Sequence, residues 1–196
     1  IPDMGPEGLN EFSRYFYPQL DKEGLIIDDR ANGGGNVSPM ILERLSREPY
    51  RLTMRRGSSL IGTVPDAVQV GPKVCLINKY SASDGDLFPW GFRALGLGKL
   101  IGTRTWGGII GISGPLPYMD GTDIRVPFFT SYDPKTGNWI IENHGVDPDI
   151  LIDNDPIKEW NGEDQQLDRA IEEVMKQLKE RKPLAPVPAP RDWSHK

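Results

Sequence analysis

The sequence predicts an α/β domain built on a mostly parallel sheet with helices on its faces. Short apolar runs at 24–28, 74–78 and 100–103 have the length and composition of buried strands. The first run leads through a glycine-rich turn into a helical stretch that contains Ile41 and Leu45. The second leads through a serine-containing turn into another helical stretch. Because strands that alternate with helices tend to lie parallel in one sheet, this order predicts the fold class.

Two further helices are predicted from apolar residues at helical spacing. Residues 7–20 place such residues three or four positions apart, and Pro18 is expected to strain or end the helix. Residues 164–181 carry apolar side chains on one face and Glu and Lys on the other. The apolar positions of this last helix are Leu167, Ala170, Ile171, Val174, Met175 and Leu178.

The remaining segments are read as a hairpin and a tail. Within 109–130, the turn signal at 119–122 separates two strand-like stretches, which predicts a β-hairpin. Prolines recur through 182–190 and prevent a helix, so an extended arm or a disordered tail is expected there. We therefore divide the chain into a domain of residues 1–181 and a tail of residues 182–196.

The composition is that of one globular domain with a mildly acidic surface. The 196 residues are 37% hydrophobic and carry a net charge of −5. No basic stripe predicts nucleic-acid binding, and no apolar run reaches the roughly 18–20 residues of a membrane span. Cys75 lies in an apolar strand and is expected in the core. Residues 1–5 resemble neither a signal peptide nor an initiation sequence, so we expect that a longer protein was divided here.

The glycine turn at 32–36 is the first candidate for chemistry. Three consecutive glycines after a strand allow backbone N–H groups to face a ligand without a Cβ in the way. No lysine follows the glycines, so a nucleotide-binding P-loop is not expected. From these residues alone, an oxyanion site and a simple tight turn both remain open.

Ser83 is the second candidate, because it follows a buried strand and precedes a helix. A hydroxyl at this corner lies beside the Asp84 N–H at the positive end of the helix, which suits nucleophilic catalysis. The alternative is a helix N-cap, since Ser with Asp nearby is the usual composition of that position. Ser81, two residues away, is a competing serine.

A catalytic serine needs a base, and the chain contains two histidines, His144 and His195. His195 lies in the polar tail and is a poor candidate. His144 lies in a compact polar loop, so a triad of Ser83, His144 and either Asp147 or Asp149 can be written. The two isolated histidines and the buried cysteine do not make a metal site.

Four segments taken together resemble a known family. They are residues 28–35, 81–86, 96–108 and 142–149, and they occur in the order seen in C-terminal processing peptidases and tricorn proteases. The match covers about residues 1–181. The resemblance implies a ClpP/crotonase-like α/β/α domain with a mostly parallel sheet and a β-hairpin insertion. It also implies that this domain is the C-terminal catalytic subdomain of a serine peptidase.

The two branches of this family differ in the base that activates the serine. In the processing peptidases a lysine in a Gly-x-x-Thr-x-Gly-Lys-Gly segment does so, and here Gly108 occupies that position. The chain therefore resembles the tricorn branch, which uses a histidine supported by a second serine and a glutamate. His144 falls where the family commonly has an aromatic residue, so it is not expected to be the base.

The resemblance implies a role for individual residues. Ser83 would be the nucleophile, and Glu142 the carboxylate that orients the histidine-bearing side. The N–H groups of Gly35 and Asp84 would form the oxyanion hole. Three further glycines are expected beside the substrate, namely Gly34, Gly107 and Gly108.

In this family the catalytic histidine and its serine partner come from an earlier region, so the chain is expected to supply only part of the active site. The resemblance implies peptide substrates, upstream propeller, PDZ-like and histidine-bearing regions, homo-oligomers, a cytoplasmic location and no cofactor. Two alternatives belong to other classes. One is a catalytically silent peptide-binding domain of the same fold. The other is a crotonase-like acyl-CoA enzyme, which would not explain why the segments around Ser83 and Glu142 both match peptidases.

Overall fold

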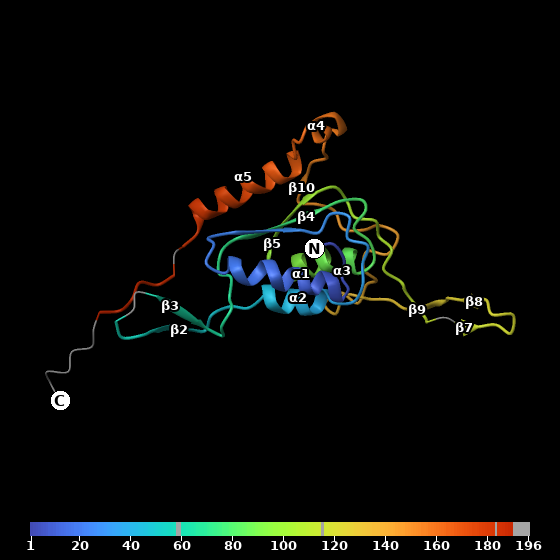
Figure 1. The fold of residues 1–196 in the computed structure, drawn as a ribbon, viewed down its shortest axis with the longest axis horizontal. Helices are drawn as coiled ribbons and strands as arrows, with labels where there is room; N and C mark the ends of the chain where they lie inside the picture. The colour runs from blue at the N-terminus through green and yellow to red at the C-terminus, as the bar shows by residue number, and fades with distance from the viewer. Residues whose placement is uncertain (58–59, 115, 183, 190–196) are drawn as a thin grey trace.

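A four-stranded sheet with the strand order β1-β4-β5-β10 forms the centre of the protein (Figure 1). Every neighbouring pair in it is parallel. The strands are β1 (Leu25–Asp28), β4 (Lys73–Ile77), β5 (Gly98–Gly102) and β10 (Ile150–Leu151). The first three confirm the predicted strands, whereas β10 was not predicted. The computed structural model describes residues 1–57, 60–114, 116–182 and 184–189.

The strand β4 is buried on both faces because it lies between β1 and β5. Since side chains alternate across a sheet, Cys75 and Ile77 face one layer of helices, whereas Val74 and Leu76 face the other. This double burial explains the continuous apolar run in the sequence. The prediction of Cys75 as a core residue is confirmed, and burial raises the pKa of its thiol.

Three helices cover one face of the sheet (Figure 1). They are α1 (Pro6–Phe16), α2 (Ser38–Leu45) and α3 (Asp84–Ala94). After α1 the chain makes a 3-10 turn, η1 (Tyr17–Gln19), so the α-helix ends just before Pro18, as predicted. The buried side chains that these helices contribute are Phe12, Phe16, Ile41, Leu45, Phe88 and Phe92.

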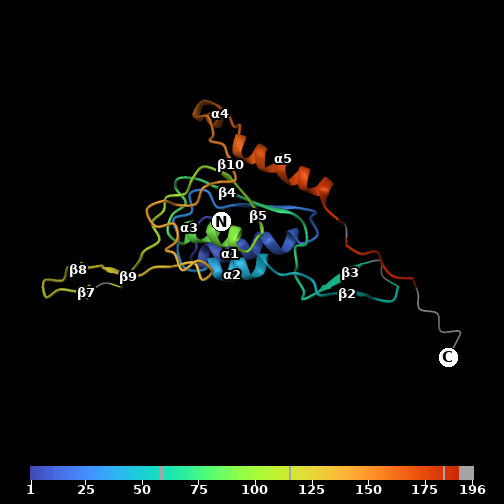
Figure 2. The same cartoon turned by 180° about the vertical axis from the view of Figure 1, so that it is seen from behind.

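The long helix α5 (Gln165–Glu180) covers the other face, and Figure 2 shows it there from behind. Ala170 and Val174 are buried against the sheet. The predicted helix is confirmed, but three residues of its predicted apolar face are 36–53% exposed, namely Leu167, Ile171 and Met175. A single helix contacts a sheet along a narrow strip, which leaves the flanking apolar positions uncovered.

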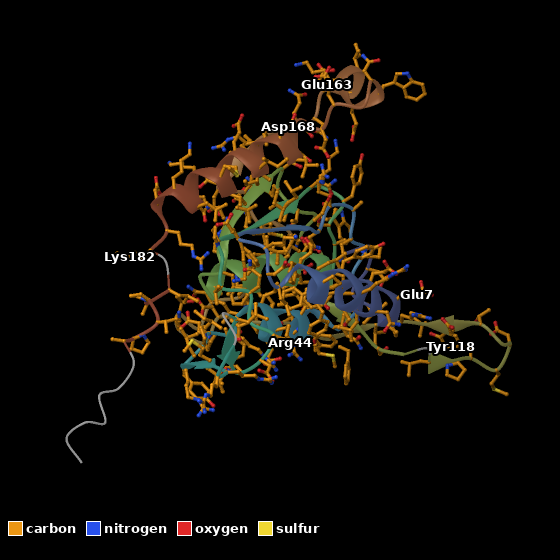
Figure 3. All side chains as sticks on the ribbon, turned by 60° about the vertical axis from the view of Figure 1, so that its left-hand side comes forward. Glu7, Arg44, Tyr118, Glu163, Asp168 and Lys182 are labelled. Carbon is orange, nitrogen blue, oxygen red and sulfur yellow. The ribbon has the colours of Figure 1, made fainter. Side chains whose placement is uncertain are left out.

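In the part of the chain that the structure describes, three antiparallel strand pairs lie outside the central sheet. Their strands are β2 (Arg51–Met54) with β3 (Ile61–Val64), β6 (Gly111–Ile112) with β9 (Pro127–Phe129), and β7 (Leu116–Pro117) with β8 (Asp123–Ile124). The predicted hairpin within 109–130 is confirmed. It extends away from the helices as an arm that carries Tyr118 (Figure 3). The β2–β3 hairpin was not predicted.

The last segments add little to the core. The short helix α4 (Pro156–Trp160) is capped by the Asp155 carboxylate, which accepts the N–H groups of Ile157 and Lys158. Residues 184–189 of the predicted tail contain neither helix nor strand, and His195 lies outside the described residues. Among the described helices, none has both the length and the hydropathy of a membrane span.

Candidate active site

Ser83 lies where the loop after β4 enters α3, as the sequence predicts. It occupies the N-cap position of α3, but its side chain makes no capping hydrogen bond. Its backbone has φ +57° and ψ −121°, a conformation that costs a non-glycine residue about 1–3 kcal/mol. The side chain is exposed. The N-cap alternative therefore does not explain this serine, whose hydroxyl is presented to solvent from a strained corner.

The competing Ser81 has a structural role instead. Its side chain is fully buried, and its hydroxyl donates to the carbonyl oxygen of Asp29 at 2.8 Å. The Ser81 hydroxyl oxygen also accepts the Asn78 N–H at 3.3 Å. Ser81 thus ties the loop after β4 to the loop after β1 and is not available to a substrate.

Two carboxylates in the first turn of α3 hold the neighbouring loops. Asp84 is buried, and its carboxylate accepts the backbone N–H of Ser38 at 2.9 Å and also the Ser38 hydroxyl. Asp86 is fully buried, and its carboxylate accepts the N–H groups of Gly107 at 2.8 Å and Gly108 at 3.2 Å. The start of α3 therefore fixes both the start of α2 and the glycine pair that follows β5.

The glycine loop after β1 lies directly against the Ser83 corner. Gly34 has φ +98°, and a Cβ on it would lie 2.6 Å from the Ser83 Cβ and 3.0 Å from the Asp84 nitrogen. Gly35 has φ +151°, and a Cβ there would collide with the backbone of Met4. Among the described residues, no acceptor is found for the N–H of Gly35 or of Asp84. These two predicted donors therefore remain available to a ligand.

Glu142 anchors the strand-like segment that leads into the arm. One oxygen of its carboxylate, Oε2, accepts the backbone N–H groups of Ile109 at 2.7 Å and Ile110 at 3.0 Å. No described donor is bonded to the other oxygen, Oε1. Glu142 thus has a structural role and one carboxylate oxygen left for another partner.

His144 is directed to Asp147 and not to Ser83. Its Nε2 lies 2.8 Å from the Asp147 Oδ2, and the Asp147 Oδ1 lies 2.6 Å from the Arg104 Nε. The hydrogen bond from His144, followed by that from Arg104, lowers the pKa of Asp147. Asp149 is also occupied, because its carboxylate accepts the Leu100 N–H at 2.7 Å. The structure joins two members of the triad that the loop suggested, but it does not bring them to the serine.

Comparison with known proteins identifies the family of the chain. The profile of peptidase family S41 matches residues 1–152. The chain belongs to peptidase family S41. The S41 assignment confirms the resemblance on which the residue roles were predicted.

Among curated relatives, the chain is 43% identical over 182 residues to the tricorn protease of Thermoplasma volcanium. It is 42% identical over 179 residues to that of Thermoplasma acidophilum, and 38% identical over 180 residues to tricorn protease homolog 1 of Streptomyces coelicolor. These matches cover 91–93% of this chain but 16–18% of the relatives' lengths. The chain thus corresponds to about a sixth of each relative.

Solved structures confirm the predicted fold. The chain matches the crystal structure of the tricorn protease with a TM-score of 0.84 and 42% identity, over 91% of this chain and 17% of that one. The photosystem II D1 C-terminal processing protease matches with a TM-score of 0.56 and 21% identity, over 78% of this chain and 41% of that one. The second likeness is one of fold alone.

The buried Lys73 lies at the opposite end of β4 from Ser83. Lys73 begins β4, whereas Ser83 follows the opposite end of the same strand. The Lys73 Nζ donates to the carbonyl oxygen of Gln69 at 2.8 Å. With Gly108 in place of the family's lysine, this geometry gives no support to a Ser–Lys pair.

Sequence reasoning missed a buried polar pair beneath the glycine loop of the S41 domain. Asp29 and Asn32 are both fully buried, and the Asn32 Nδ2 donates to the Asp29 Oδ1 at 2.9 Å. The Asp29 Oδ2 has no partner among the described residues. A sequence signal was present, since polar residues directly after a buried strand can only be buried if they bind one another or the backbone.

Asp29 makes the stability of the S41 domain depend on pH. Burial raises the pKa of its carboxyl well above the ordinary value, outweighing the nearby Ile1 ammonium, which lowers it. The folded protein therefore keeps a proton that the unfolded chain loses above about pH 4. This contribution to stability is fully present below that pH and is lost as the pH rises through the folded-state pKa.

We expect Asp29→Asn to remove this loss. The difference in Tm between the variant and the wild type should grow in favour of the variant from about pH 4 to about pH 8. Each kcal/mol of unfolding free energy that the wild type loses should correspond to roughly 2–4 °C. Thermal unfolding followed by circular dichroism checks this. Asp120→Asn is the control of opposite sign, because hydrogen bonds from Thr122 lower the pKa of Asp120. A Tm difference for Asp29→Asn that does not change with pH would contradict the prediction.

Proposed function

We propose that the protein hydrolyses short peptides through an acyl-enzyme formed on Ser83. The observation that carries the proposal is the Ser83 corner itself, in a chain of peptidase family S41. The hydroxyl is exposed and uncapped, the backbone is in a strained positive-φ conformation, and the Asp84 N–H beside it has no described acceptor. Strained, solvent-facing serines at the start of a helix are typical of nucleophiles.

The proposed oxyanion hole consists of the N–H groups of Gly35 and Asp84. When Ser83 attacks a peptide carbonyl, the carbonyl oxygen becomes negative in the tetrahedral intermediate. Two fixed backbone donors can stabilise this charge, each by about 3 kcal/mol. The close approach of Gly34 to Ser83 supports this pairing, because it brings the glycine loop against the Asp84 nitrogen. Gly107 and Gly108 would line the substrate on the other side, held by Asp86.

The general base is proposed to be a histidine from a region outside this chain. His144 is paired with Asp147, and Ser83 has no described histidine partner. The incoming histidine would take the Ser83 proton and later give it to the leaving amine. Glu142 would orient the histidine-bearing side through its Oε1, while its Oε2 stays bound to the backbone. The match to a sixth of each tricorn relative supports a longer protein, which we also propose to be a homo-oligomer.

Fluorophosphonate labelling of the longer protein tests this proposal. We expect the label on Ser83, located by fragmentation of the tryptic peptide 80–93, which also contains Ser81. His144→Ala should be labelled within about threefold of the wild-type rate, because His144 is not the proposed base. A label on Ser81, or a loss of labelling in His144→Ala of about 100-fold, would contradict the assigned roles. Absence of any label would favour the alternative, a catalytically silent peptide-binding domain.

A further inference from the structure

Asn32 joins the two loops that carry the proposed oxyanion donors. Its side-chain Oδ1 accepts the N–H of Gly34 at 3.0 Å, the residue before Gly35. Its backbone carbonyl accepts the N–H of Ala82 at 2.8 Å, the residue before Ser83. One fully buried residue thus holds both the glycine loop and the serine loop.

The contact between Asn32 and α3 leaves no space for adjustment. A Cβ on Gly85, in the first turn of α3, would collide with the carbonyl oxygen of Asn32 and lie 3.2 Å from its Cβ. The backbone of α3 therefore rests directly on Asn32. Because this contact is made by backbone atoms, the loops cannot shift relative to one another through a change of rotamer.

Asp29 connects Asn32 to the rigid sheet. The Asp29 N–H donates to the Leu76 carbonyl of β4 at 2.9 Å, and the Asp29 Oδ1 accepts the Asn32 Nδ2 at 2.9 Å. The Asn32 Nδ2 also lies 3.3 Å from the Ile1 carbonyl oxygen. The charged side chains that act on Asp29 are the carboxylates of Asp28 and Asp84, and both raise its pKa. The Ile1 nitrogen carries a charge in the isolated chain but is a peptide N–H in the longer protein. A chain of hydrogen bonds therefore runs from β4 through Asp29 and Asn32 to the Gly34 N–H.

We propose that Asn32 is a positioning residue that sets the distance between the Gly35 and Asp84 N–H groups. The inference rests on the proposed function, in which these two groups bind one oxyanion. A transition-state oxygen is stabilised only when both donors lie within about 0.5 Å of their productive places. The position requires an amide, since the side chain donates to Asp29 and accepts from Gly34 at the same time.

Two substitutions in the longer protein test this role. Asn32→Ala removes both hydrogen bonds, and we expect kcat to fall about 100-fold while KM stays within about threefold. Asn32→Asp keeps an acceptor for Gly34 but loses the donor to Asp29 and adds a buried charge. Its kcat should approach the wild-type value as the pH falls, because a proton on the introduced carboxyl or on Asp29 restores the donor. The affinity for a peptide boronate should fall with kcat, whereas the affinity for a product peptide should not.

Asn154→Asp is the matched control. Asn154 also accepts a backbone N–H, from Gln166 at 2.9 Å, and donates to a carboxylate, that of Asp164 at 3.2 Å. This variant should lower Tm without lowering kcat. A wild-type protein that neither cleaves peptides nor reacts with fluorophosphonate would reject the proposed function and this inference together. Two outcomes would reject the inference alone. One is an active wild type whose kcat differs from that of Asn32→Ala by less than threefold. The other is an Asn154→Asp variant that loses as much kcat as Asn32→Asp when both lose the same Tm.

Discussion

We expect Ser83→Ala to lower kcat of the longer protein by about 10⁶-fold, the size of the loss found when a serine nucleophile is removed. The residual rate would come from the oxyanion donors and from substrate binding, both of which the variant keeps. KM and Tm should change little, because the Ser83 hydroxyl makes no hydrogen bond with the described residues. An alanine would bear the same backbone strain as the serine.

The measurement is steady-state hydrolysis of a fluorogenic peptide, with Tm recorded for each variant. Ser46→Ala is the control. Ser46 also lies at the end of a helix, as the C-cap of α2, and its hydroxyl donates to the Glu43 carbonyl oxygen at 3.0 Å. It should retain full activity. A Ser83→Ala variant that keeps more than about a tenth of wild-type kcat would remove Ser83 from the mechanism.

Gly34→Ala is expected to have the second-largest effect. Its Cβ would lie 2.6 Å from the Ser83 Cβ and 2.8 Å from the Ala82 carbonyl oxygen, and the φ of +98° disfavours any side chain. The glycine loop must therefore move away from the Ser83 corner. If the proposed oxyanion hole spans this contact, the movement removes one donor, and kcat should fall about 100- to 1,000-fold.

Gly33→Ala provides a close control, because a Cβ on Gly33 would meet nothing within 4 Å. It should leave kcat within about threefold of the wild type. Rates of fluorophosphonate labelling should follow the same order as kcat, since labelling also builds negative charge on an oxygen. Equal kinetics for Gly33→Ala and Gly34→Ala would show that the contact with Ser83 does not matter for the chemistry.

The central strands could be predicted because double burial leaves a direct trace in the sequence. β4 reads as an unbroken apolar run for this reason. β10 leaves no such trace, because it consists of the pair Ile150–Leu151 and owes its place to pairing with Ile101 and Gly102. The exposed part of α5 shows the same limit. Periodicity reveals which side chains share a face, but not how wide a strip the sheet covers.

The position of the candidate site could be predicted from the sequence, but the contacts that shape it could not. The strand-turn-helix order placed Ser83 at the end of a buried strand, but spacing alone favoured a helix cap. The positive φ of a serine results from contacts between loops that are distant in sequence. Asn32 was read as part of a glycine turn, because its hydrogen bonds to Gly34 and Asp29 exist only once the turn is folded. The second, structural role of Glu142 was missed for the same reason.

The side chain and the backbone N–H of Asp84 have different roles. Its side chain holds the start of α2 through Ser38, while its backbone N–H is directed to the Ser83 corner as the proposed donor. Every amino acid except proline carries that N–H. The Asp84 side chain is therefore used for the docking of α2, whereas the proposed chemistry uses only the backbone N–H of this residue. A substitution of Asp84 would therefore disturb the start of α2, while any residue other than proline would still carry the N–H.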